Sequence, residues 1–124
     1  MGGDMQPQGH AQVLVNVLDL GSNLQAATDM ARFYHNEVSN KLYLESSLYN
    51  LALPGGITIG AALRAMGHEV ESANGGAVGG YQAIMFTLDP SEPAPSMDKG
   101  STAPINGFYR AGSDHRKDGG AVGW

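Results

Sequence analysis

The sequence predicts a mixed α+β domain with the element order strand, helix, strand, helix and then three strands. Three observations predict it. Some short runs are rich in β-branched and aromatic residues, others repeat apolar residues at helical spacing, and glycine or proline separates them. A chain of 124 residues, 42% of them hydrophobic, is large enough for one core. We therefore expect residues 1–124 to form a single domain.

Residues 12–20 (QVLVNVLDL) are the first predicted strand. Valine occupies one face of this run and leucine the other, so both faces are apolar. We interpret the run as a central strand covered on both sides. Gly21 ends it, and Ser22 with Gln25 three residues later fits a capping box that opens a helix extending to Tyr34.

The middle of the chain predicts two short strands and a second helix. Apolar and polar residues alternate over residues 41–45, which favours a strand. Apolar residues then recur at helical spacing over residues 59–66, and Gly67 stands where a C-terminal cap is expected. Residues 69–73 form another short strand. Four glycines within residues 74–80 predict a loop.

The last third of the chain predicts a β-hairpin. Residues 81–88 form a long strand, and residues 105–113 return as a strand paired with it. Residues 89–104 between them contain four prolines and are expected to be an exposed Pro-rich loop. Two helices cover only one face of a sheet, whereas residues 12–20 are apolar on both faces. We infer that a further layer is missing from this chain and that it docks on the face of residues 12–20.

Composition and charge exclude several classes of function. The net charge is −5 and the seven basic residues are scattered, so we expect no nucleic-acid partner. No apolar run approaches the roughly 20 residues that span a bilayer, so we expect no membrane partner. Without cysteine there is no disulfide framework and no thiolate nucleophile. Residues 1–10 lack the features of a signal peptide, and the localisation stays open.

The histidines do not predict a metal site. No two of them are three or four residues apart, so they would have to converge in space with carboxylates to bind a metal. They are His10, His35, His68 and His115. We expect neither a metal nor another cofactor.

The most unusual string is GGDMQPQGH, which begins at Gly2. Two adjacent glycines let backbone N–H groups approach a ligand closely, and two such donors can stabilise the negative charge of a tetrahedral intermediate. Gly2 and Gly3 are therefore a candidate oxyanion hole. The alternative is that they belong to a terminal loop without a ligand.

Three strings of the sequence resemble the γ-glutamyltransferase family, whose members are also called γ-glutamyltranspeptidases or glutathione hydrolases. The first is GGDMQPQGHAQVLVNVLDLGSNLQAATDMARF at residues 2–33. The second is GGYQAI at residues 79–84, and the third is GFYRAGSDHRKDGGAVGW at residues 107–124. Together they cover the chain in the family's order and identify it as the C-terminal part of the small subunit.

The resemblance implies a fold, a reaction and a role for two residues. The fold is part of the four-layer αββα sandwich of N-terminal-nucleophile hydrolases. In the family an N-terminal threonine, whose own α-amine serves as the base, attacks a γ-glutamyl carbonyl and passes the acyl group to water or an amine. A glycine pair forms the oxyanion hole, which Gly2 and Gly3 match.

The chain also departs from the family's pattern. The threonine and the residues that hold the glutamyl group lie upstream of the glycine pair in the family, and this sequence contains none of them. Met1 and His115 each stand where the family has proline. We therefore expect the isolated chain to be inactive, and its partners to be the missing upstream portion of the small subunit and the large subunit.

Several polar residues have a structural interpretation. We expect Asp114 and Arg116 to form a local, exposed ion pair of little consequence. Asn16 and Asp19 would contribute hydrogen bonds at the end of the first strand. Ser101 and Thr102 are interpreted as parts of a linker. Tyr81 is interpreted as a core aromatic residue on a strand.

Three functional hypotheses remain open. In the first, the chain is part of a γ-glutamyltransferase or glutathione hydrolase-like amidohydrolase acting on a γ-glutamyl small molecule. In the second, it is a non-catalytic remnant of that ancestry, or an interaction module that associates with itself as a homodimer. In the third, it belongs to a related acylase that acts on a different amide.

Overall fold

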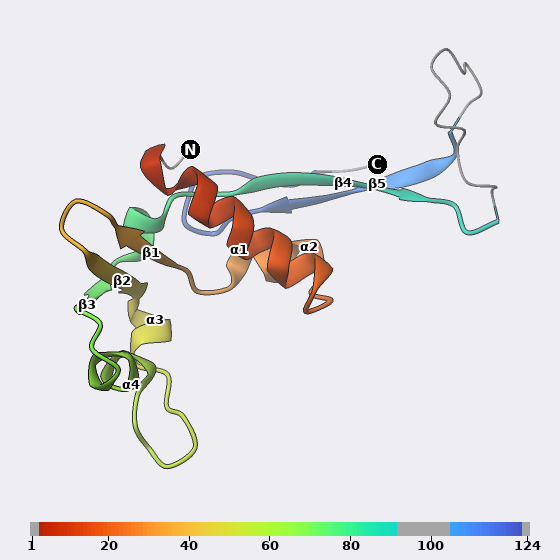
Figure 1. The fold of residues 1–124 in the computed structure, drawn as a ribbon. Helices are drawn as coiled ribbons and strands as arrows, with labels where there is room; N and C mark the ends of the chain where they lie inside the picture. Colours follow the sequence, from red (N-terminus) through yellow and green to blue (C-terminus); the bar gives the residue numbers. More distant parts are fainter. Residues whose placement is uncertain (1–2, 92–104, 123–124) are drawn as a thin grey trace.

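The structure is a computed structural model that describes residues 3–91 and 105–122. It is a mixed α+β fold, as the sequence predicts, but its element order differs from the predicted one. Figure 1 shows a body of short helices and strands from which one long two-stranded ribbon extends. The elements are η1 (Gly3–Met5), α1 (Gln6–Leu18), α2 (Leu24–Asp29), β1 (Phe33–Asn36), β2 (Lys41–Glu45), α3 (Ser46–Tyr49), α4 (Ile59–Ala65), β3 (Val70–Ala73), η2 (Gly75–Val78), β4 (Gln82–Leu88) and β5 (Gly107–Ser113).

The first predicted strand is wrong, because residues 12–18 belong to helix α1. A short run that is apolar on both faces fits a buried strand and a helix equally well. The buried positions follow the helical period instead: Met5, Gly9 and Val13 are four residues apart and form one stripe. Pro7 lies in the first turn, where its missing N–H costs nothing.

The helix predicted from Ser22 to Tyr34 is shorter and is followed by an unpredicted strand. Asn23, not Ser22, caps α2, and its side-chain oxygen accepts a hydrogen bond of 2.8 Å from the backbone N–H of Ala26. The helix ends at Asp29, after which the backbone becomes extended and forms β1. The apolar spacing of residues 22–34 does not show that residues 33–36 pair with the next strand, β2.

The other predicted strands and the second predicted helix are confirmed, whereas the predicted loop at residues 74–80 contains the 3₁₀ helix η2. The strands at residues 41–45 and 69–73 correspond to β2 and β3, and the helix at residues 59–66 corresponds to α4. The β1–β2–β3 sheet has β1 antiparallel and β3 parallel to β2. The predicted hairpin is β4 paired antiparallel with β5, with Gln82 opposite Ser113 and Leu88 opposite Gly107. The predicted loop at residues 89–104 lies outside the described residues beyond Ser91.

Helix α4 depends on two terminal caps. Thr58 is its N-cap, and its hydroxyl oxygen accepts a hydrogen bond of 3.2 Å from the N–H of Ala61. Gly67 follows the C-terminal turn with a φ of 95°, a conformation that glycine adopts without strain. The sequence signals of this helix therefore act locally, which explains why its prediction was correct.

Replacing Thr58 by alanine is expected to lower the free energy of unfolding by about 1 kcal/mol, because the N–H of Ala61 loses its acceptor. Urea denaturation followed by circular dichroism measures the change. Thr58→Ser keeps the hydroxyl and should stay close to the wild type. An unchanged midpoint for Thr58→Ala would contradict the capping role.

Helix α1 protects the free edge of the three-stranded sheet. The side-chain amide of Gln8 donates to the carbonyl oxygen of His35 at 2.9 Å and accepts from its N–H at 2.8 Å. Gln12, one turn later, makes the same pair of bonds with Phe33, at 2.8 and 3.0 Å. The two glutamines thus replace a neighbouring strand along β1. An edge whose backbone groups are satisfied in this way is closed to further strands.

The hydrophobic core is small. Its buried apolar side chains come from the helices and the three-stranded sheet: Met5, Val13, Ala27, Leu44, Val70 and Val78. The accessible surface is 8481 Å², whereas a compact monomer of 13.0 kDa exposes roughly 6300 Å². Large apolar side chains such as Leu18 and Ile84 are 73% and 75% exposed. The chain by itself therefore leaves much apolar surface in contact with water.

Candidate functional site

The candidate oxyanion glycines lie at the start of the chain. Gly2 is outside the described residues, and Gly3 opens the 3₁₀ turn before α1. Gly3 has a φ of 51°, and a Cβ placed on it would meet no heavy atom within 4 Å. The space on the side of Gly3 where a side chain would project is therefore open. Asp4 and Met5, the next residues, line a groove of about 360 Å³ together with His35 of β1.

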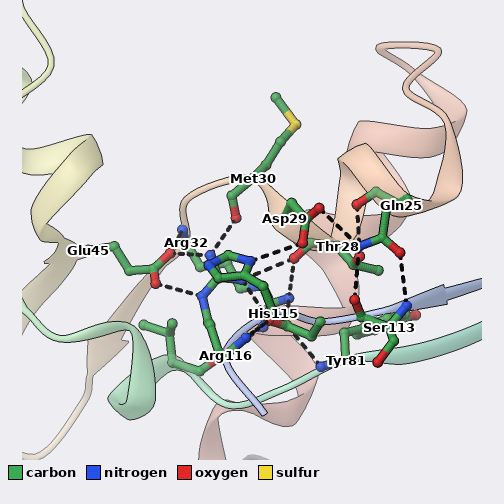
Figure 2. Close-up of polar contacts among 12 residues, drawn as sticks. Gln25, Thr28, Asp29, Met30, Arg32, Glu45, Tyr81, Ser113, His115 and Arg116 are labelled. Carbon is green, nitrogen blue, oxygen red and sulfur yellow. Dashed lines mark hydrogen bonds and ion pairs between the residues drawn. The ribbon is translucent and has the colours of Figure 1, made fainter. Parts of the chain in front are cut away.

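A buried cluster of ionised side chains holds the C-terminal segment against the body of the molecule (Figure 2). Arg116 is its centre. Its Nε and Nη2 each donate to one oxygen of Glu45 at 2.6 Å, which is the two-point geometry that guanidinium and carboxylate groups favour. Its Nη1 donates to Oδ1 of Asp114 at 2.9 Å. The same guanidinium reaches the carbonyl oxygens of Thr28 and Met30, both at 3.0 Å.

Asp114 joins the cluster to a second arginine. Its Oδ2 accepts from the guanidinium of Arg32 and, at 3.0 Å, from the N–H of Tyr81 at the start of the ribbon. Its Oδ1 also accepts from the N–H of Arg116 at 2.9 Å. Arg32 donates in turn to the carbonyl oxygen of Thr28 at 2.8 Å. Asp114 thus accepts four hydrogen bonds while it is fully buried.

Glu45 completes the cluster from the end of β2. Besides the two bonds from Arg116, its Oε2 accepts from the N–H of Arg32 at 2.7 Å. Burial raises the pKa of the Glu45 carboxyl, but the bonds from Arg116 and from the Arg32 backbone outweigh burial and hold the pKa below its usual value. Burial and hydrogen bonds oppose each other in the same way at Asp114, whose pKa is also lowered.

The charges of this cluster balance. Two guanidinium groups face two carboxylates, and the lowered pKa values keep both carboxylates ionised near neutral pH. Neither is therefore suited to act as a general acid, which requires a raised pKa. The cluster instead connects α2, the start of β1, the end of β2, the start of β4 and the C-terminal segment. Its role is structural, because it holds these five parts of the chain together.

The structure corrects the expectations for several polar residues. Asp114 and Arg116 do form an ion pair, but the predicted exposure is wrong, since their side chains are 0% and 4% exposed. Asn16 lies within α1 and Asp19 is its C-cap, so neither ends a strand. Ser101 and Thr102 lie outside the described residues. Tyr81 is half-buried beside His10, with ring centroids 5.6 Å apart.

The histidines lie apart from one another. His35 contacts Asn40 at 3.0 Å, and His115 contacts Asp29 at 2.9 Å on the surface. Within residues 3–91 and 105–122, no group of three histidine or acidic residues could hold a metal ion. Among the helices of the same residues, none is long and apolar enough to cross a bilayer.

The sequence interpretation missed Arg32 and Glu45 as members of the cluster. Glu45 is the last residue of a predicted strand, and Arg32 lies within the predicted helix that extends to Tyr34. A signal was nevertheless present, because Arg32 and the pair of Asp114 and Arg116 occur in two of the three strings that carry the family resemblance. Nothing in the local pattern shows that residues 82 positions apart meet.

Comparison with known proteins identifies one family over the whole length of the chain. The sequence profile of the gamma-glutamyltranspeptidase family matches residues 1–124. The fold is similar to gamma-glutamyltranspeptidase from Pseudomonas nitroreducens complexed with L-DON, at a TM-score of 0.62 and 20% identity over 94% of this chain and 49% of that one. None of the curated proteins matches the sequence.

Two further solved structures are similar. One is the acivicin-inhibited gamma-glutamyltranspeptidase, with a TM-score of 0.60 and 19% identity over 89% of this chain and 47% of that chain. The other is a mutant of the Helicobacter pylori enzyme, with a TM-score of 0.59 and 19% identity over 86% and 46% of the two chains. This chain therefore spans about half the length of the solved structures that it matches.

Proposed function

Because the chain belongs to the gamma-glutamyltranspeptidase family, we propose that it is the C-terminal part of the small subunit of an amidohydrolase that transfers a γ-glutamyl group to water or an amine. The single observation that carries this proposal is the family match over residues 1–124. The similar folds of three gamma-glutamyltranspeptidases support it. In this assignment residues 1–124 are one domain and contribute part of an αββα sandwich.

The rest of the catalytic machinery comes from outside the chain in this proposal. The chain corresponds to about half of each matched structure, so the missing part has room for the N-terminal threonine and the residues that hold the glutamyl group. That threonine attacks the γ-glutamyl carbonyl, with its own α-amine as the base. The isolated chain is therefore inactive, and its partners are the upstream portion of the small subunit and the large subunit.

Gly2 and Gly3 provide the oxyanion hole in this proposal. The support is the position of Gly3, whose backbone lies at an open end of the molecule with a positive φ and no side chain near it. A tetrahedral intermediate places a negative oxygen where backbone N–H donors can reach it. The groove beside Asp4, about 360 Å³ in volume, offers space for part of a small molecule.

The buried cluster gives the C-terminal segment a role in the same enzyme. In the acivicin-inhibited relative, the C-terminus has critical roles in autoprocessing and catalysis. In this chain Asp114 and Arg116 connect that segment to α2 and β2 through bonds of 2.6 to 3.0 Å. We propose that the cluster keeps the segment in place, so that loss of the cluster also impairs catalysis in the assembled enzyme.

The test is reconstitution. The chain is co-expressed with the polypeptide encoded immediately upstream of residue 1, and hydrolysis of a γ-glutamyl anilide is measured. We expect hydrolysis by the assembled complex and none by either piece. A folded complex without hydrolysis would refute the proposal.

In the active complex, Gly3→Pro is expected to lower kcat by about 10²–10³-fold, because it removes one oxyanion-hole donor. Gly21→Pro is the matched control: Gly21 also has a positive φ, of 67°, and a Cβ there also meets nothing within 4 Å. The two substitutions cause the same kind of backbone strain, but only the first lies at the candidate site. Equal losses of kcat would show that Gly3 has no special role.

The alternative function is a non-catalytic remnant or a self-associating module. The observation that favours it is the exposed apolar surface of the chain, with Leu18 73% and Ile84 75% exposed. Sedimentation of the purified chain separates the two hypotheses. A stable homodimer that does not bind the upstream polypeptide would favour the module.

A further inference from the structure

One face of the β4–β5 ribbon is apolar and uncovered. Ile84 and Tyr109 on this face are each 75% exposed, and Phe86 and Leu88 beside them are 39% and 38% exposed. Phe86 and Tyr109 lie opposite each other in the ladder, with ring centroids 5.0 Å apart. A groove of about 780 Å³ runs along this face, bordered by Val122. Figure 1 shows the ribbon extending away from the helices.

The opposite face of the ribbon contacts helix α2 at one end. At Gly112, a Cβ would meet Leu24 of α2 at 3.3 Å, so helix and strand are in close contact there. Residues along a strand alternate between its two faces, and Gly112 and Tyr109 belong to different faces. The ribbon therefore has one face that contacts α2 near Gly112 and one apolar face in solvent. Antiparallel ribbons of two strands are marginally stable at best by themselves.

The outer edge of β4 is open as well. The N–H of Asp114 bonds to the carbonyl oxygen of Tyr81, and that of Asp89 to Asn106, so the odd-numbered residues of β4 face β5. The backbone groups of Ile84 and Phe86 consequently point outward. In the described part of the chain they have no hydrogen-bond partner.

Two other edge positions of the molecule are protected by glutamine side chains, whereas the outer edge of β4 has no such partner in the described residues. Gln8 and Gln12 satisfy the edge of β1, and Gln25 does the same for the end of β5, where it bonds to both backbone groups of Ser113 at 2.8 and 3.1 Å. Exposed edges usually carry charged residues or proline. The β4 sequence QAIMFTL has neither.

We propose that β4 is the docking edge for the part of the family fold that this chain lacks, and that the docked part adds a β-strand to β4 and covers the apolar face. The length of the matched structures indicates the occupant, because they contain about as much chain again as this one. The apolar face of the ribbon and the open edge of β4 are where the described fold is incomplete. The docking surface is thus on the ribbon, not at residues 12–20. The inference rests on the proposed function.

The test uses the 124-residue chain and the polypeptide encoded upstream of residue 1. Hydrogen exchange of β4 amides is measured for the chain alone and for the complex, and we expect protection of Ile84 and Phe86 only in the complex. Ile84→Lys should weaken binding by about tenfold or more, because a buried strand edge rejects an unpaired charge. The melting temperature of the chain alone should not change, since Ile84 is 75% exposed.

Met66→Lys is the matched control, because Met66 is 73% exposed and is the C-cap of α4, a helix that lies away from the ribbon in Figure 1. Binding that is equally sensitive to both substitutions, or β4 amides that stay unprotected in the complex, would overturn the docking proposal. So would the absence of an upstream polypeptide that binds, or a homodimer that protects β4 without it.

The two proposals fail in different ways. A complex that depends on Ile84 but does not hydrolyse the γ-glutamyl anilide would refute the proposed function and leave the docking edge in place. An active complex that tolerates Ile84→Lys would refute the docking edge alone.

Discussion

Replacement of Arg116 by alanine is expected to lower the free energy of unfolding by about 3–5 kcal/mol, which is the cost of breaking a buried ion pair. The substitution removes two of the three donors to the carboxylate of Glu45 and one donor to Asp114. Both carboxylates then remain buried with less compensation. Urea denaturation of the purified chain, followed by circular dichroism, measures the loss.

Two variants make the Arg116 prediction specific. Arg116→Lys keeps the charge but cannot contact both oxygens of Glu45 in the plane of a guanidinium, so we expect an intermediate loss. Lys41→Ala breaks the half-exposed pair with Glu71, whose atoms are 2.5 Å apart, and should lower the stability far less than Arg116→Ala, because water screens exposed ion pairs. The structural role of Arg116 would be refuted if Arg116→Ala were as mild as Lys41→Ala.

Acid is expected to destabilise the chain through the same cluster. Glu45 and Asp114 have pKa values below their ordinary values of 4.5 and 3.8, because hydrogen bonds from arginine outweigh the effect of burial. A carboxyl with a lowered pKa in the folded state contributes stability that is complete above its ordinary pKa. That contribution is lost as the pH falls through the folded-state pKa. The stability from these groups should thus be constant from pH 6 to 8 and decline below about pH 5.

Urea midpoints measured between pH 7 and pH 3 test the acid prediction. The double variant Glu45→Gln with Asp114→Asn should start less stable at pH 7 and lose less on acidification. Asp29→Asn is the control: Asp29 also has a lowered pKa, from hydrogen bonds with Gln25 and His115, but its side chain is 40% exposed. A double variant with the same acid slope as the wild type would show that other groups determine acid unfolding.

The elements predicted correctly are those whose signals are local. Helix α4 has a hydroxyl cap at Thr58 and a glycine at position 67, and both act within one turn of the helix. The β4–β5 hairpin has alternating residues on each side of its proline-rich connection. In such segments, each residue's preference agrees with the final fold, and the pattern can be interpreted without knowing the neighbours.

The errors occurred where tertiary contacts decide between two local options. Residues 12–18 satisfy both a strand pattern and a helix pattern, and the helix is decided by Gln8 and Gln12 bonding to the edge of β1 and by Val13 entering the core. The helix predicted to reach Tyr34 is cut short because β1 pairs with β2. The glutamine contacts join residues 27 and 21 positions apart, and the β1–β2 pairing joins residues on two separate strands.

The sequence by itself determined the family, the α+β class and the places of β2, α4, β3 and the hairpin, because these depend on motifs and short-range periodicity. Only the tertiary structure decided that α1 is a helix and that Arg32, Glu45, Asp114 and Arg116 form one buried cluster. It also shows the exposed apolar face of β4, where we propose that the missing part docks. The reason is physical: burial and charge pairing are properties of groups brought together by the fold, and neighbouring residues do not encode them.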